Sequence, residues 1–384
     1  MAEAQPTQQV SLPSTVDTVA ASVMVVYVAG EQRVVTGSAA LVKAAIANPA
    51  LAPSLYGRLR ALASDVSLQV LGRVRSLASQ AVDVASRNGN ASAAREIRAL
   101  ERRAENFAAS PIAEMLPHNV TASAAMAQDL ALRLGAAAQR ITRYADDAYR
   151  AATTAGALAQ INPALDVVHR TLNSATPAEA QAQAWRELTS RGITGFTDSA
   201  GREWNLATYV EMATRTATQR AYNASHRERL TLAGINYFTI STTGRPCPLC
   251  APWEGMVLAD TPGTVTEDGH TFTVTATIED AMAAGLFHPN CKHTLTAYLP
   301  GFTQLKPNQW TPDDEAKYRD TQKLRALERA VRQARQVQAA ALTPSDRAAA
   351  GRDVRAAQAN VRAFTAQTGL NRRNRREQLN LGNE

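Results

Sequence analysis

Cysteine and aromatic residues are scarce in this chain of 384 residues: three positions are Cys, and 5% are Phe, Trp or Tyr. All three cysteines lie within residues 247–291, an odd number that excludes the paired disulfide framework of a small secreted protein. The longest apolar run, Val19–Ala29, is far shorter than the roughly 20 residues that cross a bilayer. We therefore expect no membrane helix, and the polar start MAEAQPTQQVSLPST also lacks the basic residues of a secretory signal.

Alanine, in contrast, makes up roughly a fifth of the chain. Alanine is the best helix former and contributes little to a pleated sheet surface, so the composition predicts a mainly α protein. The net charge is +7, and residues 313–384 hold 15 Lys/Arg against 9 Asp/Glu, or +6 of it. The basic character therefore belongs to the C-terminal fifth of the chain.

Changes in composition and the positions of glycine and proline divide the chain into five segments. We expect a flexible arm over 1–15, an Ala-rich helical domain over 16–200, a long helix plus a small α+β lobe over 201–302, a helical hairpin over 303–370 and a basic, solvated tail over 371–384.

Local signals place several boundaries inside these segments. Thr-Pro pairs that combine a cap with a proline at the first helical position predict helix starts at 176–177, 311–312 and 343–344. Alternating residues predict strands over 235–241 and a hairpin over 263–274, and glycine predicts helix ends at Gly234 and Gly369. We further expect a break at Asn88-Gly89-Asn90, a loop over 191–202, and a helix from about 203 to 233.

One group of Cys and His residues has the spacing of metal ligands. Cys247 and Cys250 are separated by two residues, so both thiolates can face one ion from a tight turn, and Cys291 can add a third ligand. Either His288 or His293 would be the fourth ligand, and the pattern predicts a structural zinc site. The alternative is three reduced thiols packed as small hydrophobic groups, with a disulfide under oxidising conditions.

A catalytic alternative comes from the zinc nucleobase deaminases, which combine H-x-E with P-C-x-x-C. The chain contains His226-Arg-Glu228 and Pro246-Cys247-Pro-Leu-Cys250. His226, however, lies deep inside the predicted long helix with no strand before it, so we expect His226 and Glu228 on a solvated helix face. The chain has no Gly-rich phosphate loop, G-x-S-x-G or H-E-x-x-H motif, and we predict that it is not an enzyme.

An ordered set of motifs resembles a known family. It comprises Tyr209-Val-Glu-Met-Ala-Thr-Arg-Thr216 with Arg220 and Asn223, Ala233-Gly-Ile235, Arg245-Pro-Cys-Pro-Leu-Cys250, Trp253-Glu-Gly255, Gly285-Leu-Phe-His-Pro-Asn-Cys-Lys-His293 and Tyr298-Leu-Pro-Gly301. The set is similar to that of the tailed-phage minor capsid protein 2 family, which is related to Mu F-like head-morphogenesis proteins. Some members of the family have His at the position of Cys250, a change that keeps a metal ligand.

The resemblance implies a virion structural or head-morphogenesis protein that acts at the portal vertex or the capsid interior, after assembly in the host cytoplasm. Its implied partners are the portal protein and the major capsid protein, and no membrane. The basic tail adds double-stranded packaged DNA as a candidate partner, because its arginines can neutralise phosphates. We also expect Arg215 and Arg220 to be solvated charges, with contact to a partner or to the metal lobe as the alternative. Removal of residues 371–384 should leave the fold intact but weaken assembly or DNA contact.

Overall fold

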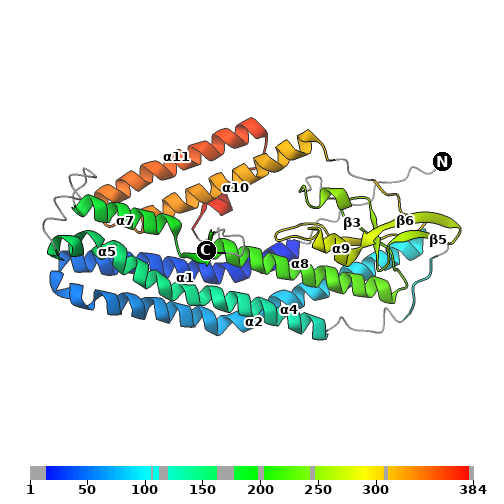
Figure 1. The fold of residues 1–384 in the computed structure, drawn as a ribbon, viewed down its shortest axis with the longest axis horizontal. Helices are drawn as coiled ribbons and strands as arrows, with labels where there is room; N and C mark the ends of the chain where they lie inside the picture. Colours follow the sequence, from blue (N-terminus) through cyan, green and yellow to red (C-terminus); the bar gives the residue numbers. More distant parts are fainter. Residues whose placement is uncertain are drawn as a thin grey trace. The chain divides into compact units, whose positions relative to one another are not determined.

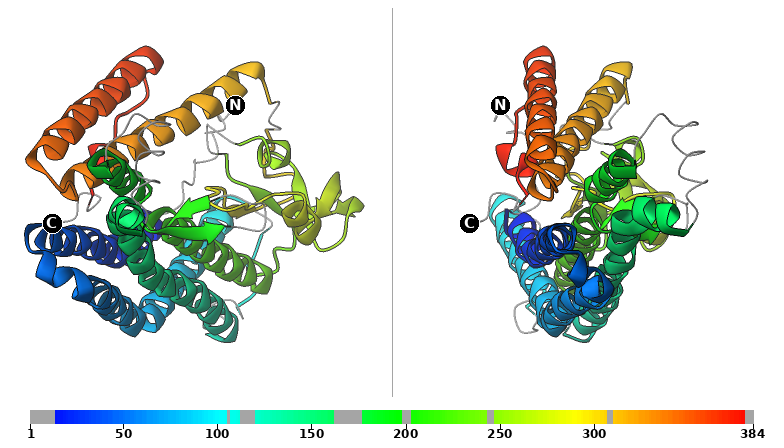
Figure 2. Two further views of the ribbon diagram at one scale, coloured as in Figure 1. Left: turned by 60° about the vertical axis from the view of Figure 1, so that its left-hand side comes forward. Right: turned by 90° about the vertical axis from the view of Figure 1, so that its left-hand side faces the viewer.

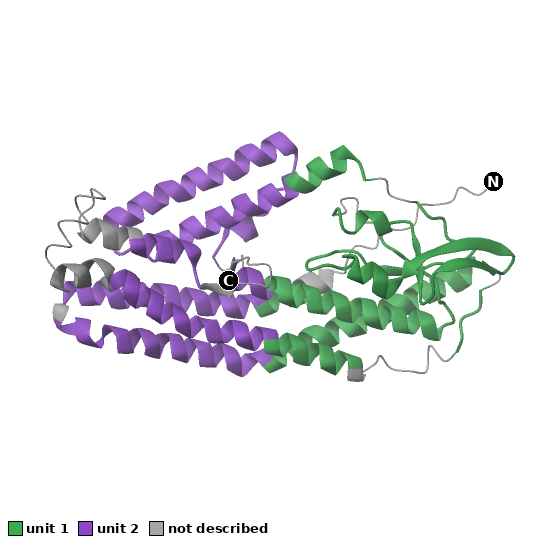
Figure 3. Cartoon of the chain, viewed as in Figure 1, with its two compact units in different colours: residues 1–23, 75–132, 211–319 green, residues 24–74, 133–210, 320–384 purple. Residues whose placement is uncertain are grey.

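The structure is a computed structural model that describes residues 14–104, 107–111, 120–161, 177–197, 203–242, 247–306 and 310–379. It contains two compact units, each assembled from three separate segments of the chain (Figure 3). Unit 1 comprises residues 1–23, 75–132 and 211–319, and unit 2 comprises residues 24–74, 133–210 and 320–384. The five sequence-based segments stay a prediction.

Most described residues are helical, which confirms the predicted fold class (Figures 1 and 2). The α-helices are α1 (Ser14–Ala47), α2 (Ala52–Arg103), α4 (Val120–Gln139), α5 (Arg143–Ile161), α7 (Pro177–Arg191), α8 (Leu206–Leu232), α9 (Ile278–Ala283), α10 (Pro312–Ala339) and α11 (Pro344–Thr368). Short 3-10 helices are η1 (Pro49–Leu51), η2 (Arg140–Thr142), η3 (Ala251–Trp253) and η4 (Asn374–Glu377). The strands are β1 (Thr194–Thr197), β2 (Glu203–Asn205), β3 (Phe238–Ile240), β4 (Val257–Ala259), β5 (Gly263–Glu267), β6 (His270–Thr277) and β7 (Leu295–Ala297).

Unit 1 is built on a five-stranded sheet with the order β5-β6-β4-β3-β7. All neighbours are antiparallel except β4 and β6, which are parallel. The β5–β6 hairpin turns at Asp268 and Gly269, both with positive φ, as the sequence predicts. Behind β3 and β7, one apolar core joins Ile97 of α2 and Leu230 of α8 to Phe238, and this core includes Cys250 and Cys291.

The predicted break at Asn88-Gly89-Asn90 is wrong, because α2 continues through it. Gly89 instead marks a close approach of two helices: a Cβ at this position would lie 2.2 Å from the carbonyl oxygen of Tyr222 in α8. Asn88 Nδ2 bonds back to the Val84 carbonyl at 2.8 Å, and Arg229 Nη1 donates to Asn90 Oδ1 at 3.1 Å. The Asn and Gly residues of this segment support helix packing here. The sequence alone does not distinguish this role from the formation of a turn.

The core of unit 2 encloses an acidic side chain. Glu31 of α1 is 5% exposed, and its Oε1 accepts hydrogen bonds from Ile193 N (2.8 Å) and Asn205 Nδ2 (3.2 Å). Gly192 has φ +67, and a Cβ there would lie 2.5 Å from Glu31 Oε1, so only glycine fits both the backbone and the space. The loop expected over 191–202 is therefore partly wrong, because β1 pairs with β2 across it. Residues 198–202 lie outside the described residues.

We expect Glu31→Gln to change how unfolding depends on pH. Burial raises the pKa of Glu31 against its hydrogen bonds and the nearby Arg332, so the folded pKa lies above the unfolded one. The protonated carboxyl is compatible with burial, so its contribution to stability is fully present below the unfolded pKa. It is lost as pH rises through the folded pKa, and the total loss is about 1.4 kcal/mol for each unit by which the two pKa values differ. Urea unfolding should show the difference between Glu31→Gln and wild type moving in the variant's favour from about pH 4 upwards. Parallel curves would contradict this, and exposed Glu187→Gln is the control.

The predicted C-terminal helical hairpin is confirmed. α10 and α11 begin at Pro312 and Pro344, and α11 ends at Gly369 in the left-handed conformation. Thr343 caps α11 by accepting from Asp346 N at 3.0 Å. The two helices pack through Leu324, Val331, Val361 and Phe364.

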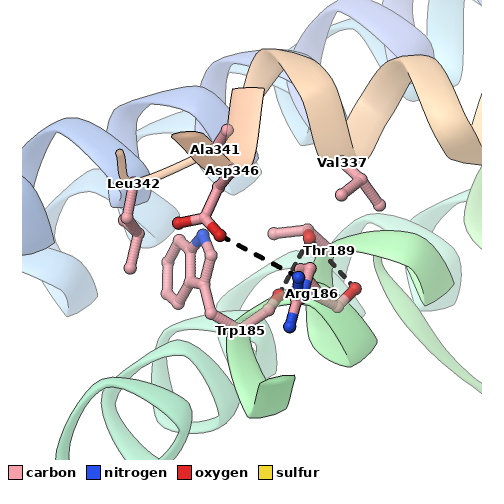
Figure 4. Close-up of a pocket in the computed structure, with 7 residues that line it drawn as sticks. All are labelled: Trp185, Arg186, Thr189, Val337, Ala341, Leu342 and Asp346. Atoms are coloured by element: carbon pink, nitrogen blue, oxygen red, sulfur yellow. Dashed lines mark hydrogen bonds and ion pairs between the residues drawn. The ribbon is translucent and has the colours of Figure 1, made fainter. Parts of the chain in front are cut away.

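α7 is joined to the α10–α11 turn by one tryptophan. Trp185 is 2% exposed and donates from its indole N to the Ala340 carbonyl at 2.9 Å. Beside it an Arg186–Asp346 ion pair of 3.9 Å borders a small pocket (Figure 4). The pocket is lined by Trp185, Arg186, Thr189, Val337, Ala341, Leu342 and Asp346. Because this lining contains no thiol or imidazole, we interpret the pocket as a helix-packing contact and not as a metal site.

The expectation of a wholly solvated basic tail is wrong for its described part. Residues 374–377 form η4, and Glu377 is 1% exposed. Arg372 donates to both oxygens of Glu377, from Nε and Nη2, at 2.6 Å each. Arg376 lies 3.8 Å from Glu328, a buried carboxylate of α10. Two tail arginines are thus engaged inside unit 2, while residues 380–384 lie outside the described residues.

In the part of the chain that the structure describes, one helical stretch, Thr18–Ala47, is long and apolar enough to cross a membrane by length and composition alone, with a mean hydropathy of 1.2. The uninterrupted apolar run Val19–Ala29 is too short to predict this stretch, because polar residues interrupt the apolar ones after it. Half of the window is buried inside the protein, and core helices of soluble proteins pass the same test.

Candidate metal centre

The first pair of cysteines lies on a tight turn of unit 1. Residues 248–250 form a turn that leads directly into η3, and the amides of Cys250 and Ala251 donate to the Cys247 carbonyl at 3.1 and 2.9 Å. This backbone pattern holds both thiols on one side of the turn. Arg245 and Pro246, which begin the motif, lie outside the described residues.

The second group of donors follows α9. Thr277 caps α9 by accepting from Asp280 N at 2.9 Å, and the chain then turns through Phe287 and Asn290, both with positive φ. Cys291 N donates to the His288 carbonyl at 2.9 Å, which closes this turn. The two turns bring His288, Cys291 and His293 to the Cys247–Cys250 turn.

All five predicted ligand residues meet in one cluster. Cys247, Cys250 and His288 form one group, and Cys250, Cys291 and His293 a second, with donor atoms within 4.8 Å of one another in each. The Sγ atoms of Cys250 and Cys291 are 3.5 Å apart. Cys291 Sγ lies 3.4 Å from His293 Nδ1, and Cys247 Sγ lies 2.8 Å from His288 Nε2. The three cysteines are free thiols.

The electrostatics of the cluster favour thiolates beside imidazoles. Hydrogen bonds with the central Cys250 lower the pKa of Cys247 and of Cys291, and the same contacts raise the pKa of Cys250. Burial by itself would lower the pKa of His293, but Cys291 and Glu254 outweigh it and raise the pKa to about 9. A divalent cation placed among these donors would take over the role of the imidazole protons, because thiolates are the metal-binding form.

Glu254 is the member of the site that the sequence analysis missed. Its Oε1 lies 2.7 Å from His293 Nε2, and both side chains are almost fully buried. A carboxylate on the second imidazole nitrogen fixes the tautomer and orientation of a metal-binding histidine. Gln219 of α8 further holds this segment by donating to the His293 carbonyl at 2.8 Å. The Trp-Glu-Gly motif was the available signal, but nothing in its spacing connects Glu254 to His293.

The donor set fits zinc. Tetrahedral zinc with Zn–S bonds of about 2.3 Å places sulfur atoms about 3.8 Å apart, and sulfur and nitrogen about 3.5 Å apart. The Cys250–Cys291 and Cys291–His293 distances are close to these values, whereas the Cys247–His288 distance is that of a hydrogen bond. Cys250, Cys291 and His293 therefore have the spacing of three zinc ligands, and Cys247, which shares the other donor group with Cys250, is the thiol available as the fourth.

A family model described as phage minor capsid protein 2 matches residues 69–366, more than half of the chain and all of the cluster. The chain belongs to the phage minor capsid protein 2 family. The resemblance noted in the sequence is thereby confirmed, and the family supports a phage structural role as a virion component. Neither the curated proteins nor the solved structures yield a match.

The deaminase-type pairing of His226 with the cysteines does not form. Neither candidate metal group among the described residues contains His226 or Glu228. His226 is 2% exposed, with Nε2 2.8 Å from Glu96 Oε2 and Nδ1 3.2 Å from the Gly89 carbonyl oxygen. The expected solvated position for His226 is therefore wrong, because α2 supplies a carboxylate that the local pattern cannot reveal.

The two arginines predicted to be exposed differ. Arg220 is exposed, as expected. The prediction for Arg215 is wrong, because its side chain is only 18% exposed and its Nη2 lies 3.1 Å from Glu211 Oε1, one turn earlier. Both belong to the family-like motif on α8, where the residues at 211 and 215 form a partly buried ion pair.

Proposed function

We propose that this chain is a non-enzymatic structural protein of the phage head, placed at the portal vertex or on the capsid interior. The observation that carries the proposal is the family match over residues 69–366. Its partners would be the portal protein and the major capsid protein. The long helices offer extended surfaces for such contacts, and His226, the residue that a deaminase-like mechanism would need, is engaged by Glu96.

Within this role the Cys/His cluster binds one zinc ion that stabilises the small α+β lobe. Cys247, Cys250, Cys291 and His293 are the four ligands, and His288 is an outer partner of Cys247. Support comes from the donor distances, from the buried Glu254 behind His293, and from the greater burial of His293. A site closed by four protein groups has no open position for a substrate, which agrees with a non-catalytic role.

The test is whether the protein travels with assembled particles. An epitope-tagged chain expressed in the phage's host should cosediment with mature heads and, after the shell is dissociated, remain with the portal ring. Absence from mature heads would contradict the virion role. Cosedimentation with shell fragments but not with the portal ring would overturn the portal placement. An unrelated protein of similar size with the same tag is the control for nonspecific trapping inside heads.

A further inference from the structure

The outer side of α11 is a continuous face of arginine and alanine. Successive helical residues turn by about 100°, so residues spaced by three, four and seven positions share one side. The side opposite α10 reads Ala-Arg-Arg-Ala-Ala-Arg-Ala-Ala along the helix, and all of its members are exposed. This arginine face consists of Arg352, Arg355 and Arg362 with Ala348, Ala356, Ala359, Ala363 and Ala366.

The other side of α11 explains why the arginine face stays outward. Val361 and Phe364 are buried against α10, and Gly351 and Val354 of the same helix are buried as well. Asp353, the exposed acid of the helix interior, lies on a flank about 100° from Arg352 and further from the other two arginines. Within unit 2, α11 lies at the edge in all views (Figures 1 and 2).

The three guanidinium groups have no counter-charge of their own. Among residues 310–379, no ion pair involves Arg352, Arg355 or Arg362. This differs from the tail, where Arg372 and Arg376 are committed to Glu377 and Glu328. The cationic surface open to a partner therefore lies on α11 more than on the tail that the sequence suggested.

We propose that the arginine face binds the phosphate backbone of double-stranded DNA, without reading its sequence. Arg352 and Arg362 are ten residue steps apart, about 15 Å along the helix, which matches a stretch of duplex carrying about nine phosphates. The small alanines let the helix approach the backbone closely. The face lacks the Trp and Tyr side chains that, with Arg, are enriched at the energetic centres of protein interfaces, and its charges are all of one sign, which favours a polyanion over a protein surface.

The experiment compares two triple variants of the full-length protein with equal loss of charge. One is Arg352→Gln, Arg355→Gln, Arg362→Gln. The control is Arg58→Gln, Arg73→Gln, Arg143→Gln, which removes three exposed arginines elsewhere in unit 2. Binding to a fluorescent duplex of about 30 base pairs and mixed sequence is followed by anisotropy from about 50 to 300 mM salt, and circular dichroism melting checks that both variants are folded.

Each phosphate contact adds about 0.9 to the slope of log affinity against log salt, so the α11 variant should lose up to about 2.7 of the slope and the control little. Equal losses in the two variants, or no duplex binding by the wild type at low salt, would overturn the proposal. An α11 variant that keeps the wild-type slope would overturn it as well, since the arginine face would then make no phosphate contacts. The measurement uses purified protein, so its outcome is independent of portal association.

Discussion

Cys291→Ser is expected to abolish stoichiometric zinc binding and to unfold the lobe that contains residues 247–299. Structural zinc contributes its binding free energy to folding, on the order of 10 kcal/mol in small zinc domains, far more than the packing of one thiol. Cys291 also lies in the apolar core behind β3 and β7, so loss of the ion leaves a polar, charged cluster inside that core. Helices α10 and α11 of unit 2, which have their own apolar contacts, should keep their hydrogen-exchange protection.

A matched pair of histidine variants separates the ligand from its neighbour. His293→Gln should lose most of the zinc measured by elemental analysis, whereas His288→Gln should retain it with a modest loss of affinity, because His288 contacts Cys247 at hydrogen-bond distance. Glu254→Gln should weaken binding by about 10- to 100-fold, the usual effect of removing such an orienting group. Wild-type protein purified under reducing conditions without stoichiometric zinc would overturn the metal proposal. Zinc retained by His293→Gln but lost by His288→Gln would reverse the ligand assignment.

The parts of the fold that sequence predicts are those set by local chemistry. Thr343 and Pro344 begin α11 because a hydroxyl can cap the free amides and proline suits the first helical position, and Gly369 ends it because glycine adopts the left-handed conformation at little cost. The metal donors are predictable for a similar reason. Cys and His are rare in the chain, so their clustering at zinc-type spacing is informative even without coordinates.

The errors arise where the partner of a residue lies far along the chain. Asn88-Gly89-Asn90 has turn-forming residues, but the packing of Tyr222 against Gly89 decides its structure, 133 positions later. His226 is buried because Glu96 meets it from α2, a separation of 130 residues, and Glu254 acts on His293 across 39. No periodicity or motif encodes these pairings, since each depends on how helices and strands are arranged in unit 1.

The tail is the error with the largest energetic consequence. Its composition, four arginines in five positions with few apolar residues, is typical of a solvated segment. Composition could not reveal that Glu377 would be buried with two hydrogen bonds from Arg372, nor that Glu328 of α10 would have Arg376 beside it. Burial raises the pKa of Glu328, and the nearby Arg376 opposes that rise. The tail therefore contributes counter-charge to carboxylates inside unit 2.

Arg372→Met is accordingly expected to lower the free energy of unfolding of unit 2 by about 3 kcal/mol. Removing one member of a buried ion pair leaves the other charge without compensation, and Glu377 is 1% exposed. Arg375→Met is the matched control: Arg375 is exposed, has no ion pair among residues 310–379, and should change stability by less than about 0.5 kcal/mol.

The double variant Arg372→Met, Glu377→Met should regain most of the loss, because it removes the buried charge together with its partner. Urea unfolding combined with hydrogen exchange of α10 and α11 reports on this unit directly. If Arg372→Met and Arg375→Met were equally mild, Glu377 would not depend on Arg372, and the tail would be the dispensable segment that its composition suggests. A destabilised single variant and a recovered double variant would show that Glu377 depends on Arg372. Truncation at residue 371 is expected to weaken the helical hairpin in addition, since it leaves Glu328 without Arg376.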